Sequence, residues 1–265
     1  MSDLSDLACL CCSDPLERVR YFPRMLMTAD DMRAEQEYFR EKARRHNRYL
    51  HGWGVVCGCT VEAIPGKPRQ VRVCPGYLVG PQGDEVCIDR CIDVDLHTGA
   101  EEQPCSVRWP CPPLGEPPAS RDGRVTVYIA ARYAECFSRP MRVHPAGCGC
   151  DETGCEYSRV RDSYEIKVLW NLPESHIQAG KDDAAWCGTV RDERALIRRR
   201  RTFPVPPCPR CETDPWVVLA TVSFATSSDP ANTNNAGANQ PAIRFDDRRV
   251  LLSTQHLQVA AVCLE

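Results

Sequence analysis

The spacing of apolar residues changes once along the chain, at residues 51–54, and this change restricts the fold more than any other feature. Before it, from Ala29 to Leu50, apolar side chains recur at the three-, four- and seven-residue spacings of one helix face. After it, apolar and polar residues alternate over short segments bounded by proline or glycine, as in half-buried strands. The pattern predicts a mainly β protein with an N-terminal α-helix.

A capping box predicts where the helix begins. Thr28 precedes Asp31 by three residues, a spacing at which the hydroxyl and the carboxylate can each accept a backbone N–H of the first turn. The apolar stripe of this helix has two interpretations: it packs on its own domain, or it docks on a neighbouring protein. For the docking interpretation, the expected partner-binding residues are Met32, Phe39, His46, Leu50 and Trp53.

The strand pattern predicts two small β subdomains, meander- or sandwich-like, joined by a proline-rich connection. The expected strands are 55–61, 70–79, 85–89, 91–96, 124–133, 163–170, 216–224, 243–245, 250–253 and 257–262. Between 171 and 215 no clear pattern is found. The expected parts are an N-terminal arm (1–20), a docking domain of helix plus β-meander (21–103), the proline-rich connection (104–123) and a cysteine-rich β domain (124–265).

The chain contains eighteen cysteines, and their clustering predicts a metal site. In a reducing compartment, clustered cysteines more often bind metal than form disulfides. Two short-range groups have the spacing of zinc knuckles, and four of their five thiolates would complete a closed, structural zinc site. The candidate ligands are Cys148, Cys150, Cys155, Cys208 and Cys211. Free thiols and disulfides remain alternatives, and the sequence does not pair the other cysteines.

Charge and the missing motifs exclude several function classes. The net charge of -3 argues against a nucleic-acid binder, which needs a cationic face. No apolar run is long enough to span a membrane, and the N-terminus lacks the segments of a secretory signal. We therefore expect a cytoplasmic protein, or one released as part of a particle. The chain also lacks the HExxH, GxSxG and phosphate-loop motifs, so we expect no enzyme.

Several motifs resemble a family of bacterial proteins associated with phage-tail-like contractile injection systems. An LxTAxD motif stands at 26–31, an HNRxLHGxGV run at 46–55 and a cysteine followed by SRxR at 155–161. A proline-glycine step at 75–76 and a glycine turn at 83–84 complete the similarity. The resemblance covers residues 21–96 most closely and 125–224 less closely. The N-terminal cysteines and the proline-rich insert depart from the pattern.

The resemblance implies a structural component of the baseplate or fibre, with other particle subunits as partners and no catalytic residues. Self-association is expected too, because such particles are symmetric and their interfaces repeat. Two other functions stay open at this point. One is a metal-dependent hydrolase that uses Cys, His and Asp ligands. The other is a secreted binding module held by disulfides.

Overall fold

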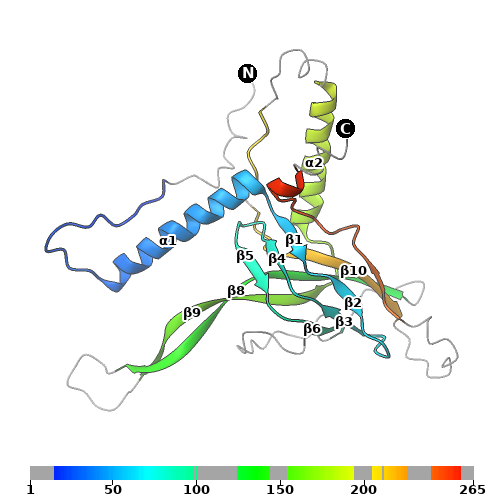
Figure 1. The fold of residues 1–265 in the computed structure, drawn as a ribbon, viewed down its shortest axis with the longest axis horizontal. Helices are drawn as coiled ribbons and strands as arrows, with labels where there is room; N and C mark the ends of the chain where they lie inside the picture. Colours follow the sequence, from blue (N-terminus) through cyan, green and yellow to red (C-terminus); the bar gives the residue numbers. More distant parts are fainter. Residues whose placement is uncertain are drawn as a thin grey trace.

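The computed structural model describes residues 15–97, 99–100, 124–143, 154–193, 205–210, 212–225 and 240–257. It confirms a mainly β protein with an N-terminal α-helix and several small antiparallel sheets (Figure 1). Within the described residues, no helix is long and apolar enough to cross a membrane. The proline-rich connection lies outside the described residues and stays a prediction.

The N-terminal half contains the predicted helix and six short strands, followed by a seventh of two residues. Helix α1 (Ala29–His46) continues into one π-helical turn, η2 (Asn47–His51). The strands are β1 (Gly54–Gly58), β2 (Val61–Ala63), β3 (Gln70–Val73), β4 (Gly76–Val79), β5 (Glu85–Ile88), β6 (Ile92–Asp95) and β7 (Gly99–Ala100). They form a three-stranded sheet, β1-β4-β5, and a four-stranded sheet, β2-β3-β6-β7.

Two of the predicted strands, 55–61 and 70–79, are each broken in the middle, and the two halves belong to different sheets. The first breaks where Gly58 and Cys59 adopt positive φ values of 62° and 51°. The second breaks beside it, and a Cβ on Gly76 would lie 2.1 Å from the backbone nitrogen of Cys59. Because the two backbone segments approach this closely, the segments 55–61 and 70–79 both bend at this point. A single strand over 55–61 would put Cys57 and Cys59 on the same face, but the break separates them: Cys57 is exposed and Cys59 is buried.

The C-terminal half is built on one long hairpin. Strands β8 (Arg124–Val143) and β9 (Gly154–Leu169) extend well beyond the predicted segments, and β10 (Val217–Ala225) and β11 (Ala242–Arg244) complete a sheet in the order β11-β10-β8-β9. The region 171–215, where the sequence shows no clear pattern, contains helix α2 (Glu174–Asp192). Of its described residues only Ser175 and Ala179 are buried, which explains the weak apolar pattern.

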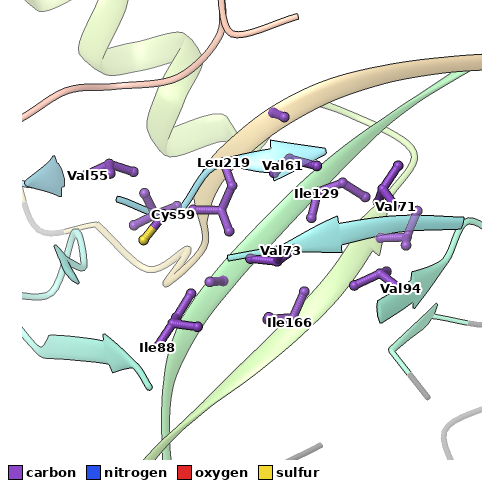
Figure 2. Close-up of a cluster of buried hydrophobic side chains, with 14 of the residues drawn as sticks. Val55, Cys59, Val61, Val71, Val73, Ile88, Val94, Ile129, Ile166 and Leu219 are labelled. Carbon is purple, nitrogen blue, oxygen red and sulfur yellow. The ribbon is translucent and has the colours of Figure 1, made fainter. Parts of the chain in front are cut away.

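The buried side chains of both halves form one hydrophobic cluster. Figure 2 shows Val61, Val71 and Val94 of the small sheets beside Ile129, Ile166 and Leu219 of the large one. The small sheets therefore pack on the face of β8, β9 and β10 rather than on cores of their own. This packing leaves α1 and the far end of the β8–β9 hairpin without a place in the cluster (Figure 1).

Candidate docking site

Helix α1 begins at the predicted capping box. The backbone N–H of Asp31 donates to Thr28 Oγ1 at 3.1 Å, and the backbone N–H of Thr28 donates to Asp31 Oδ2 at 2.9 Å. The Thr28 hydroxyl also donates to Asp31 Oδ2 at 2.7 Å, and this bond, together with the one from the Thr28 backbone N–H, lowers the pKa of Asp31. The helix start is thus fixed by local contacts and needs no support from the rest of the molecule.

The C-terminal end of α1 is held on the body by polar contacts. Arg44 Nε lies 2.7 Å from Asp84 Oδ1, and Asn47 Nδ2 donates to the carbonyl oxygen of Gly83 at 2.9 Å. Burial lowers the pKa of Arg44, but the bond and charge of Asp84 outweigh it, so the net shift is upward. Gly83 has a φ of 90°, and a Cβ there would lie 2.3 Å from the carbonyl oxygen of Arg44. We call Arg44, Asn47, Gly83 and Asp84 the seat of α1.

The apolar stripe of α1 faces away from the body. Met32 is 53% exposed, Phe39 57% and Leu50 68%, and His46 is exposed as well. No residue of α1 is buried. Four of the five predicted partner-binding residues are therefore accessible to another protein.

Trp53 differs from those four residues. Its side chain is only 9% exposed and lies in the hydrophobic cluster, edge-on to His176 at 4.8 Å between ring centroids. The guanidinium of Arg249 covers the ring at 5.0 Å, and Arg249 Nε donates to the Trp53 carbonyl at 3.1 Å. Trp53 thus anchors the chain below α1, and its side chain is not available to a partner.

The far part of the β8–β9 hairpin forms a second projecting surface, which we call the ribbon. Strand β10 pairs with β8 only as far as Ala131, so beyond that residue β8 is paired with β9 alone. Phe137 stacks on Tyr157 at 5.9 Å, and Val160 stands directly opposite Phe137; all three are exposed. An ion pair between Arg40 and Glu135 joins α1 to the root of the ribbon. Figure 1 shows α1 and the ribbon projecting toward the same side of the molecule.

The predicted zinc site falls mostly outside the described residues. Cys148, Cys150 and Cys211 lie there, whereas Cys155 on β9 and Cys208 are exposed free thiols. Among the described residues, no three His, Cys, Asp or Glu side chains are grouped to hold a metal ion. Zinc binding therefore stays a prediction. Cys136, on β8, takes part in a disulfide bond.

A cavity of about 420 Å³ lies where α2 meets the C-terminal segment, and it was not foreseen from the sequence. His176 lines it. The Nε2 atom of this histidine accepts the N–H of Val218 at 3.0 Å, and the ring also bonds to the backbone of Asp247. Burial lowers the pKa of His176 to about 4. Because both sides of the ring are engaged by backbone, His176 serves to join α2 to β10. No local sequence signal marks this role, since its partners are distant in the chain.

Comparison with known proteins adds no family or relative: no family model matches the chain, and no curated protein matches it.

Proposed function

We propose that this protein is a structural docking subunit of a phage-tail-like contractile injection particle, and that α1 and the ribbon together bind a neighbouring subunit. The observation that carries the proposal is the outward-facing apolar stripe on a firmly seated helix. The resemblance of the 26–31, 46–55 and 155–161 motifs supports the kind of particle. The protein then acts in the cytoplasm, where such a particle is built, or is released with it.

The size of the two surfaces explains why both are needed. Full burial of Met32, Phe39 and Leu50 would contribute about 5 to 9 kcal/mol. Association of two proteins costs about 4 to 15 kcal/mol in lost motion, so α1 alone would bind weakly. The ribbon adds Phe137, Tyr157 and Val160, which roughly doubles the apolar area offered. Their joint use is favoured because the Arg40–Glu135 pair links α1 to the ribbon.

The expected partner surface is an apolar groove. An amphipathic helix binds such grooves through residues spaced at three, four and seven positions. The α1–η2 stripe has these spacings between Met32, Phe39, Ala43, His46 and Leu50. In a symmetric particle the same contact repeats in every copy, and several weak contacts then add to a strong attachment. Copies of this chain are expected to assemble around the particle in the same way.

The test compares Phe39→Glu with Ala34→Glu in the organism that makes the chain. Both residues are exposed on α1, but Ala34 lies off the stripe. Particles are purified by sedimentation, identified by electron microscopy and analysed for this protein. We expect the wild type and Ala34→Glu to co-sediment with the particles and Phe39→Glu to stay in the supernatant. If all three behave alike, or if the wild type is absent from the particles, the proposal is wrong.

A structural zinc ion remains part of the proposal. The test is the metal content of protein purified without chelator, for the wild type and for a Cys148→Ser/Cys211→Ser variant. We expect roughly one zinc per chain in the wild type and none in the variant, together with a lower melting temperature. Absence of zinc from the wild type would overturn the zinc proposal and leave docking untouched.

A disulfide-stapled binding module is the second candidate function, because Cys136 takes part in a disulfide bond. A thiol count before and after reduction separates the two candidates. If the purified protein has few free thiols and binds no metal, the stapled module is favoured. If most thiols are free or bound to metal, the intracellular docking subunit is favoured.

A further inference from the structure

Cys74 and Cys91 occupy facing positions at the end of the inner strand pair, β3 and β6, of the four-stranded sheet. In the antiparallel pairing of β3 with β6, Val73 lies opposite Ile92. Cys74 follows Val73, and Cys91 precedes Ile92, so the register places the two cysteines opposite each other. The sequence did not pair them, because the fold brings together residues separated by two strands and a turn.

The hydrogen-bond pattern identifies the type of pair. The backbone N–H of Cys74 donates to the carbonyl of Thr60 at 2.8 Å, which is on the β2 side of β3. Cys74 and Cys91 therefore form a pair without backbone hydrogen bonds between them. In such pairs the Cα atoms are about 4.5 Å apart and the side chains are closest. That separation lies within the range that a disulfide spans.

The two side chains are close enough to interact. Partial desolvation and the interaction with Cys74 raise the pKa of Cys91, and Cys91 is exposed while Cys74 is half-buried. The separation typical of such a pair lets a disulfide form without rearranging the strands, and a small oxidant can reach the exposed Cys91.

We propose that Cys74 and Cys91 form a reversible redox site that closes to a cross-strand disulfide. The exposed Cys91 thiolate attacks a small disulfide such as oxidised glutathione, forms a mixed disulfide and releases one reduced thiol. The Cys74 thiolate then displaces the second one. The protein loses two electrons and two protons, and the oxidant gains them as two thiols.

The bond would restrict the segment that seats α1. Residues 75–90 lie between the two cysteines and include β4, β5 and the turn at Gly83 and Asp84. This turn contacts Arg44 and Asn47 at the end of the helix. The disulfide thus holds together the base from which α1 projects. The reaction needs no docking partner, so a test on the isolated protein separates it from the proposed function.

The neighbouring cysteines provide a matched control. Cys57 and Cys87 are also exposed, but Tyr77 stands between them in the register of β1, β4 and β5. Cys59 is buried, and burial raises its pKa to about 11, so it reacts poorly as a nucleophile.

The experiment uses the full chain, reduced and then equilibrated with mixtures of reduced and oxidised glutathione. Free thiols are trapped by alkylation, and disulfide-linked peptides are mapped by mass spectrometry. We expect a peptide pair joining Cys74 to Cys91, lost on reduction and absent from a Cys91→Ser variant, with Cys57 and Cys87 not joined to each other. Amide exchange at residues 82–86 should also slow on oxidation in the wild type alone.

If Cys74 and Cys91 remain alkylated as free thiols under mixtures that oxidise other cysteines, or if Cys74 links mainly to a different cysteine, the proposal is overturned. The closure rate offers a second measurement. Partial desolvation and the hydrogen bond to Cys74 raise the pKa of Cys91, while Arg72 opposes them, so closure should accelerate as the pH rises above neutral.

Discussion

Acidification should destabilise this protein through His176, and the size of the effect follows from its surroundings. The imidazole is buried and its pKa lies at about 4, against about 6.5 in an unfolded chain. Between these two values the unfolded state binds one more proton than the folded state. The stabilising effect of the neutral ring is therefore complete above about pH 6.5 and is lost as the pH falls toward 4. A difference of about 2.5 pKa units corresponds to about 3 kcal/mol.

The contacts of His176 give the physical reason. Its Nε2 atom accepts the backbone N–H of Val218, so a protonated ring would place two donors face to face. The charge of Arg249 nearby opposes protonation further. Acid should therefore loosen the contact between α2 and β10 first.

The assay is urea unfolding of the wild type, His176→Gln and the control His51→Gln at several pH values from 4 to 7. His51 is exposed, so its variant should follow the wild type. His176→Gln should be less stable at neutral pH and should lose the histidine-dependent slope of about 1.4 kcal/mol per pH unit. If the difference between wild type and His176→Gln does not change with pH, the reasoning about burial is refuted.

Two further predictions concern the seat of α1, each with a matched control. Arg44→Ala leaves the carboxylate of Asp84 without its charged partner, and we expect a loss of about 2 kcal/mol in urea unfolding; Arg33→Ala breaks only an exposed pair and should change stability by less than about 0.5 kcal/mol. Gly83→Ala brings a Cβ against the carbonyl of Arg44 at a positive φ and should lower the melting temperature clearly. Gly180→Ala, in open space within α2, should raise the stability by up to about 1 kcal/mol. Equal effects within either pair would contradict this account of the seat.

Features decided by neighbouring residues could be predicted from the sequence. The capping box at Thr28 and Asp31, the start of α1 and most strands are of this kind, because caps and alternation act over a few residues. Features decided by distant contacts could not. The bend at Gly58 and Cys59 depends on the backbone at Pro75 and Gly76. The alternation of apolar and polar residues gives no sign of this contact. Likewise α2 buries mainly small residues, so it leaves little helical signal.

In the candidate site, too, the residues set by local spacing could be predicted and those set by distant contacts could not. The stripe residues Met32, Phe39 and Leu50 were found from their spacing, while Trp53 was assigned to a partner although its ring packs on His176. The partners of Trp53 come from α2 and from the C-terminal segment, both far along the chain. An aromatic residue between two glycines has no local feature that distinguishes a core anchor from a docking residue.

The direction in which α1 faces is the feature that the sequence leaves most open, and it carries the most weight for function. In an isolated protein, turning the stripe inward would gain about 1.5 to 3 kcal/mol for each large side chain buried. The observed orientation does not make this gain, because Arg44 and Asn47 bind Asp84 and Gly83. Those polar groups would lose their partners if the helix rolled over. Polar contacts therefore hold the helix in an orientation that leaves its apolar stripe in water. This orientation supports the proposal that a second protein covers the stripe.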